Sequence, residues 1–116
     1  MGDCCWLIDH GASLYFHHTW DNWKEQSQRP FTQIKDHVLL PQAALLGAAD
    51  DKMKNLITPE VIRSIVQAVP DTWLQSPGVE QSPQERRDVY IAFLMERIGN
   101  TAIFLNEAKN ARELLV

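Results

Sequence analysis

The sequence predicts a mainly α-helical domain with one short β-strand near its start. The clearest observation is Ser82-Pro83-Gln84-Glu85, a capping box with proline at the first helical position. A second helix start is Thr58-Pro59-Glu60, where a threonine cap, a proline and an early acid follow one another. Between such starts, apolar residues recur at intervals of three and four, which is the spacing of one helix face.

Length and composition are those of one modest globular domain. The 116 residues are 45% apolar and 22% charged, which is enough for a small core. The net charge of −4, without a stripe of lysine and arginine, argues against nucleic-acid binding. No apolar run approaches the roughly 20 residues of a membrane span, and no signal peptide is recognisable. Cys4 and Cys5 are adjacent and are interpreted as reduced thiols, so we expect a cytoplasmic protein.

The stretch most suggestive of chemistry begins with Trp6-Leu7-Ile8, the apolar end of a strand predicted over Cys4 to Ile8. Asp9, His10 and Gly11 follow at once. A carboxylate at the mouth of an apolar strand is costly to bury unless a partner neutralises it. The glycine lets the backbone turn sharply directly after the acid. If the chain holds a chemical site, we expect Asp9 to carry it.

From Trp20 onward the sequence predicts helices, separated by polar loops over residues 26–30 and 75–81. The expected helices are a short one with Trp20 and Trp23 on one face and Thr19 as cap, then residues 31–40, 42–57, 58–69, 71–74, 82–98 and 101–116. Trp73 is expected to enter the core from the single turn over 71–74. Gly99-Asn100 is expected to end its helix with a left-handed residue.

Two stretches carry a family resemblance. Trp6-Leu7-Ile8-Asp9-His10-Gly11-Ala12-Ser13-Leu14-Tyr15-Phe16-His17-His18, followed by Ile34-Lys35-Asp36-His37-Val38-Leu39-Leu40-Pro41, resembles the C-terminal part of a bacterial HipA-like kinase family. More distantly, Ile8-Asp9-His10-Gly11 is similar to the Ile-Asp-Phe-Gly segment of phosphatidylinositol 3- and 4-kinases. The resemblance extends over essentially the whole chain.

The resemblance implies the helical C-terminal lobe of a kinase-like fold with one residual N-terminal β-strand. It implies a single domain over residues 1–116, in which 1–30 hold the metal loop and an aromatic and histidine-rich segment and 31–116 form a helical scaffold. In a full-length relative, Asp9 would bind Mg²⁺ for ATP, and Gly11 would belong to the same cofactor-binding turn.

The same resemblance implies groups that this sequence lacks. A catalytic Asp-Arg motif followed by Asn is expected before the strand, and the chain begins too late to hold it. The nucleotide-gripping lysine and the glycine-rich loop are absent as well. Because phosphoryl transfer needs several metal-binding and positioning groups held together, no catalytic residue is assigned. We expect a kinase fragment that is inactive alone and binds neither Mg²⁺ nor ATP alone.

Two other functions stay open. A small helical module that has lost catalysis would bind another protein, or a second copy, through the N-terminal strand and an exposed apolar face. A weaker alternative is a zinc or nickel protein. Its candidate ligands are His10, His17, His18 and His37 with Asp9 or Asp21. Histidines hydrogen-bonded in a polar groove are favoured over this metal site. The aromatic residues Phe16, Trp20 and Trp23 are expected in the core rather than stacked on a ligand.

Overall fold

The computed structural model describes Leu14 and residues 20–116, and this part is mainly helical. The helices, with η marking the 3₁₀ type, are η3 (Trp20–Asn22), α1 (Trp23–Ser27), η4 (Thr32–Asp36), η5 (Leu40–Gln42), α2 (Leu46–Leu56), α3 (Pro59–Gln67), α4 (Asp71–Leu74), α5 (Pro83–Gly99) and α6 (Ala102–Leu115). The described residues contain no strand, so the prediction of a mainly α chain is confirmed for them. The strand predicted over Cys4 to Ile8 lies outside the described residues.

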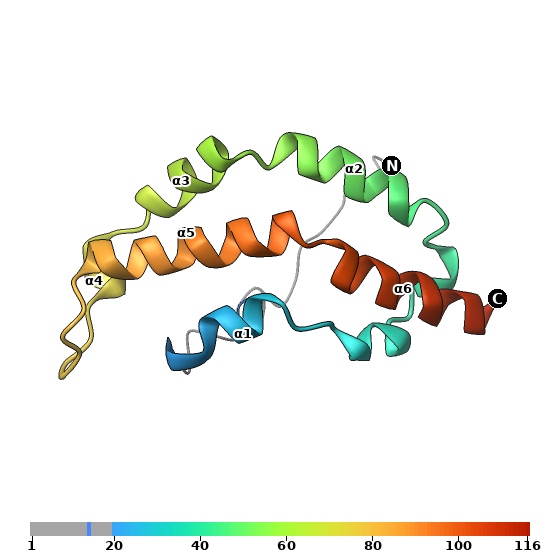
Figure 1. Ribbon diagram of the computed structural model, residues 1–116, viewed down its shortest axis with the longest axis horizontal. Helices are drawn as coiled ribbons and strands as arrows, with labels where there is room; N and C mark the ends of the chain where they lie inside the picture. The colour runs from blue at the N-terminus through green and yellow to red at the C-terminus, as the bar shows by residue number, and fades with distance from the viewer. Residues whose placement is uncertain (1–13, 15–19) are drawn as a thin grey trace, which may run out of the picture.

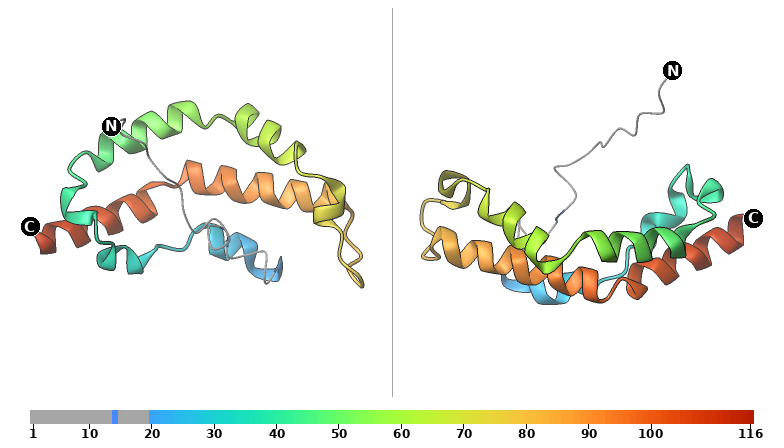
Figure 2. Two further views of the ribbon diagram at one scale, coloured as in Figure 1. Left: turned by 180° about the vertical axis from the view of Figure 1, so that it is seen from behind. Right: turned by 90° about the horizontal axis from the view of Figure 1, so that it is seen from above.

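The helices lie side by side in a thin, curved layer (Figure 1). α5 and α6 follow one another along its middle, with α2 and α3 on one side and α1, η4 and η5 on the other. The layer measures 49 × 33 × 24 Å. Its radius of gyration, 16.3 Å, exceeds the roughly 13 Å of a compact domain of this length. Seen from above, the layer bends where α5 meets α6 (Figure 2).

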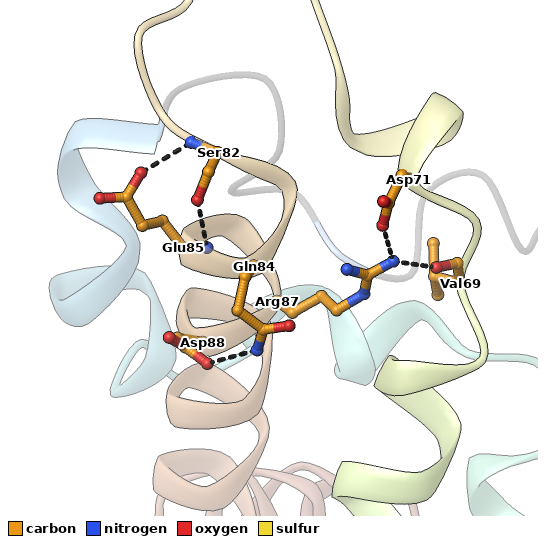
Figure 3. Close-up of polar contacts among 7 residues, drawn as sticks. All are labelled: Val69, Asp71, Ser82, Gln84, Glu85, Arg87 and Asp88. Carbon is orange, nitrogen blue, oxygen red and sulfur yellow. Dashed lines mark hydrogen bonds and ion pairs between the residues drawn. The ribbon is translucent and has the colours of Figure 1, made fainter.

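Both helix starts predicted from local sequence are confirmed. Thr58 caps α3, because its Oγ1 accepts a hydrogen bond from the amide of Val61 at 3.3 Å. At α5, Ser82 Oγ accepts from the amide of Glu85 at 3.2 Å, and the Glu85 carboxylate accepts from the amide of Ser82 at 2.6 Å. This is a complete capping box (Figure 3). Each cap contributes about 1 kcal/mol to helix stability, so both helices begin at a defined residue.

The first half of the chain is less regular than predicted. The helix expected over residues 31–40 is only the 3₁₀ turn η4, which ends at Asp36. The helix expected over 42–57 begins four residues late, at Leu46, because Pro41 lies in the separate turn η5. Leu45 precedes this helix and offers no side-chain cap. Because no capping residue marks where this helix begins, the prediction relied on the apolar pattern alone and gave a start four residues too early.

Trp73 is not in the core, contrary to the prediction. It is 75% exposed, whereas its neighbour Leu74 is 5% exposed. The short helix α4 packs against α5. Because neighbouring residues on a helix point about 100° apart, only one of the two side chains can face α5. The smaller, branched Leu74 takes that place.

The left-handed exit predicted at Gly99-Asn100 is also wrong. Gly99 is the last residue of α5, and Asn100 ends the helix with φ −122°. Among the described glycines, Gly78 alone has a positive φ, at 78°. The backbone amide of Asn100 donates to the carbonyl oxygens of Glu96 at 3.1 Å and Arg97 at 3.3 Å, and its side-chain Nδ2 also donates to that of Glu96 at 3.0 Å. The last carbonyls of α5 are thus bonded without a left-handed residue.

The buried apolar side chains of the described residues fall into two small groups. The first lies on α3, α4 and α5 and consists of Ile62, Val66, Leu74 and Phe93. The second consists of Leu40, Ala108 and Ala111, with Ile34 and Leu46 packed at its edge. Other large apolar side chains are exposed, among them Val38, Leu39, Leu45, Ile65, Trp73 and Leu114. No helix in the described part combines the length and the apolarity that crossing a membrane requires.

Phe93 is the largest side chain of the first group and is 6% exposed. We expect Phe93→Ala to lower the free energy of unfolding by about 3–5 kcal/mol, because lost burial and a residual cavity add. Leu114, which is 89% exposed, provides the matched control. Leu114→Ala should change the free energy by less than about 0.5 kcal/mol. Urea unfolding followed by circular dichroism measures both, and equal losses would contradict the packing described.

Candidate functional site

The residues predicted to form the magnesium site lie outside the described part of the chain. They are Asp9, the expected metal ligand, and Gly11, the expected turn residue of the cofactor site. His10, His17 and His18 of the alternative metal site also lie outside it. The roles assigned to these residues therefore stay predictions.

The described members of the histidine and aspartate set form no metal cluster. Asp21, Asp36 and His37 are exposed. Among the residues that the structure describes, no three or more His, Cys, Asp or Glu side chains group to hold a metal ion. The Nδ1 atom of His37 accepts a hydrogen bond from the amide of Leu39 at 3.2 Å. This bond gives His37 a local structural role in the turn between η4 and η5.

A shallow, open groove lies between α1 and the C-terminal half of α5. It encloses about 540 Å³ and is lined by Trp23, Lys24, Ala92, Met95, Glu96, Gly99 and Asn100. Trp23 belongs to the aromatic set expected in the core, but it is half-buried and forms part of this wall. Its described lining combines apolar surface with the amine of Lys24, the carboxylate of Glu96 and the amide of Asn100.

Arg87, near the start of α5, holds the turn before α4 (Figure 3). It is 8% exposed, and its Nη2 donates to the carbonyl oxygen of Val69 at 2.6 Å and pairs with Asp71. The Asp71 side chain is 64% exposed, so solvent screens the ion pair. The hydrogen bond to the carbonyl oxygen of Val69 is therefore the main contact between Arg87 and this turn. The Nε atom of Arg87 has no hydrogen-bond partner within the described residues, which reduces the net gain.

Arg86 holds the opposite end of the same short helix. It is 5% exposed, and its Nη1 donates to the carbonyl oxygen of Leu74 at 2.7 Å and to Ser76 Oγ at 3.3 Å. Arg86 thus bonds Leu74, the last residue of α4, and Ser76 beyond it. Arg87 bonds Asp71, the first residue of α4, and Val69 before it. Together they fix α4 on α5 from both ends.

Arg97, near the end of α5, connects three helices. Its Nη1 donates to the carbonyl oxygens of Ser27 at 3.2 Å and Arg29 at 2.7 Å, at the end of α1. Its guanidinium carbon lies 4.7 Å from the centroid of the Phe104 ring on α6, a cation–π distance. Burial lowers the pKa of Arg97, but a guanidinium stays charged at neutral pH. One cation therefore contacts α1, α5 and α6.

Asp50 links α2 to α6. Its Oδ2 accepts hydrogen bonds from Lys54 Nζ at 2.9 Å and from Thr101 Oγ1 at 3.0 Å. The Asp50 side chain is 9% exposed, and Thr101 is 5% exposed. The hydrogen bond from Lys54 lowers the pKa of Asp50 below its ordinary value of 3.8, and the bond from Thr101 acts in the same direction. The carboxylate is therefore held in its charged form.

Comparison with known proteins adds no relative. No protein-family model, curated protein or solved structure matches the chain. The polar groups are therefore assigned from their own geometry. The three arginines and Asp50 bond to backbone oxygens or to neighbouring side chains, and their role is to hold helices together. Of the features in the described residues, the open groove beside α1 and the exposed apolar side chains leave apolar surface accessible to a partner.

The arginines that hold the helices together were not singled out from the sequence, although a signal exists for Arg86 and Arg97. Arg86, Phe93 and Arg97 are seven and four residues apart, so they share a face of α5. A cation on the face that carries the buried Phe93 is at an apolar position, which requires a bonding partner for its charge. Spacing relative to Phe93 would have found Arg86 and Arg97. It would not have revealed which carbonyls they bond.

The Asp50 bonds predict a pH dependence. Because its folded-state pKa is lowered, Asp50 contributes stability above its ordinary pKa of 3.8, and this is lost as the pH falls through the folded-state value. We expect Asp50→Asn to lower the melting temperature at neutral pH and to flatten its decline below that ordinary value. Asp51→Asn, on the exposed side of α2, is the control and should keep the wild-type decline. Identical acid profiles for wild type and Asp50→Asn would contradict the assignment.

Proposed function

We propose that this chain is the helical C-terminal lobe of a cytoplasmic HipA-like kinase, in which Asp9 binds Mg²⁺ for ATP and Gly11 forms the adjoining turn. In this proposal residues 20–116 are the scaffold of the lobe. The mainly helical architecture is compatible with it. No Asp-Arg pair occurs in the 116 residues, so the catalytic motif of the family would have to come from polypeptide packed against this lobe.

The observation that supports the proposal best is the thin helical layer with its exposed apolar side chains. Leu45 is 76% exposed, Ile65 is 62% exposed and Trp73 is 75% exposed. The two buried groups are small, and both broad faces of the layer lack covering helices in the described part (Figure 2). Leu45 precedes α2, Ile65 lies on α3 and Trp73 lies on α4, and packing against other polypeptide would remove their apolar surface from water. A lobe that forms one wall of a larger kinase would have such surfaces.

The donor set explains why the lobe alone is expected to be inactive. Mg²⁺ prefers six oxygen ligands and keeps water unless phosphate oxygens and carboxylates replace it. Asp9 supplies one carboxylate. When bound, Mg²⁺ would neutralise phosphate charge, and Asp9 would orient it. The base or positioning Asp and the second metal-binding group are still required, so the lobe contributes one part of a composite site.

A second candidate function is a helical interaction module without catalysis, and Trp73 favours it. This side chain is 75% exposed, yet its helix α4 is fixed at both ends by Arg86 and Arg87. A tryptophan presented on a rigid element loses little conformational entropy on binding, and tryptophan is enriched among the residues that dominate interface energies. The weaker His and Asp metal alternative stays a prediction, because Asp9, His10, His17 and His18 lie outside the described residues.

The kinase proposal is tested with the protein as its own cells produce it. A tagged chain is purified from those cells with any polypeptide joined or bound to it, and Mg²⁺-dependent ATP turnover is measured. We expect turnover, and a loss of at least about 100-fold in Asp9→Ala, because charge stabilisation at the phosphates is removed. Asp21→Ala, at an exposed position, is the control and should keep wild-type turnover.

Residues 1–116 expressed alone should show no phosphoryl transfer. Turnover by this chain alone that disappears in Asp9→Ala would overturn the lobe proposal, since the chemistry would then be complete within it. Absence of turnover from the cell-derived protein would instead contradict kinase activity. The helical interaction module would then be the remaining candidate function.

Exposed apolar side chains also predict self-association of residues 1–116 when no partner covers them. We expect light scattering at high micromolar concentration to give a dimer or a larger species. Trp73→Ser should shift the population toward monomer, whereas Thr72→Ser at the exposed neighbouring position should not. A clean monomer for the unmutated chain would count against an exposed binding face.

A further inference from the structure

The helices of the described part divide into two halves that meet at the end of α5. In the first half α5 packs against α1, α3 and α4, and in the second half α6 packs against α2, η4 and η5. Three connections pass between the halves, at residues 28–31, 57–58 and 100–101. Figure 1 shows all three crossing the middle of the layer, and Figure 2 shows the layer bent there.

The buried apolar groups follow the same division. The group with Phe93 lies on α3, α4 and α5 of the first half. The group with Leu40 joins η5 to α6 and is confined to the second half. At the junction the buried residues are polar instead: Ser27 is 1% exposed and Thr101 is 5% exposed. The side-chain bonds of both stay within one half, from Ser27 Oγ to the carbonyl oxygen of Lys24 and from Thr101 Oγ1 to Asp50 Oδ2. Neither bond therefore resists bending at the junction.

The Arg97 side chain spans this junction. Arg97 projects from the last turns of α5, bonds the carbonyl oxygens of Ser27 and Arg29, and faces the Phe104 ring of α6. Its contacts therefore include α1 and the connection after it in one direction and the second half in the other. Gly99 follows in the last turn of α5, and a Cβ at that position would meet nothing within 4 Å. Space around the backbone and a missing side chain both permit bending there.

We propose that residues 99–101 form a hinge between the two halves and that Arg97 is its latch. While the Arg97 guanidinium contacts Phe104, the bend between α5 and α6 is held at one angle. When that contact is lost, the second half moves as a unit about residues 99–101, since its own buried group stays intact. This inference does not depend on kinase activity.

The test measures the distance distribution between one spin label in each half. The labels are attached at Arg63→Cys on α3 and Asn110→Cys on α6, both exposed positions, with Cys4→Ser and Cys5→Ser removing the native thiols. Pulsed electron resonance on the full chain should give one narrow distribution. Arg97→Ala should widen it about twofold, because a second bend becomes populated.

Two further variants distinguish bending at residues 99–101 from increased mobility of all the helices. Gly99→Ala added to Arg97→Ala should narrow the distribution again, because alanine restricts the backbone. Gly47→Ala is the matched control: its Cβ would meet only the end of the Lys109 side chain, and it lies in α2, away from the junction. It should leave the widened distribution unchanged.

The helical signal in circular dichroism shows whether Arg97→Ala is folded, and therefore which variant is used for the distance measurement. If Arg97→Ala keeps its helical signal and gives the wild-type distribution, the latch is wrong. If Arg97→Ala loses its helical signal, Phe104→Leu replaces it, because leucine keeps the apolar contact and removes the ring that faces the cation. A wild-type distribution in folded Phe104→Leu would then overturn the proposal, and a widened one would support it.

Discussion

Hydrogen bonds from arginine side chains of α5 to backbone carbonyl oxygens hold the first half of the layer together. Arg86 bonds the last residue of α4, Arg87 bonds the residue two before its start, and Arg97 bonds the last residue of α1 and the connection after it. A hydrogen bond to a charged group contributes about 1.5–3 kcal/mol, which is comparable to burying one large apolar side chain. Because the apolar groups are small, these bonds matter more here than in a compact domain.

The other elements depend on where these arginines are placed. The capping box at Ser82 fixes the start of α5, and Arg86 and Arg87 lie in the first turns after it. Their bonds set the position of α4, which turns Leu74 inward and leaves Trp73 at the surface. The exposed tryptophan is therefore a consequence of how α4 is attached. A binding role for it follows from rigid presentation rather than from exposure alone.

The sequence correctly predicted the two capped helix starts, whereas its uncapped helix start at 42 and its left-handed exit at Gly99-Asn100 were wrong. The caps at Thr58 and Ser82 bond amides three residues away, so local pattern was sufficient. The burial of Leu74 in place of Trp73 depends on the contact with α5, and no local pattern contains it. For the candidate site, Asp9 came from a family resemblance and stays a prediction. Arg97 could have been found from its spacing to Phe93, but its carbonyl partners are about 70 residues away and needed the fold.

Binding to the open faces and bending at the junction would be coupled. A polypeptide that packs across both halves fits only one angle between α5 and α6. Such a partner shifts the hinge toward that angle in proportion to its preference for it. A partner that contacts Trp73 alone touches one half and leaves the bend unaffected. The contact of Arg97 with Phe104 would therefore affect the affinity of such a partner. A chain already held at the angle that the partner fits loses less conformational freedom on binding.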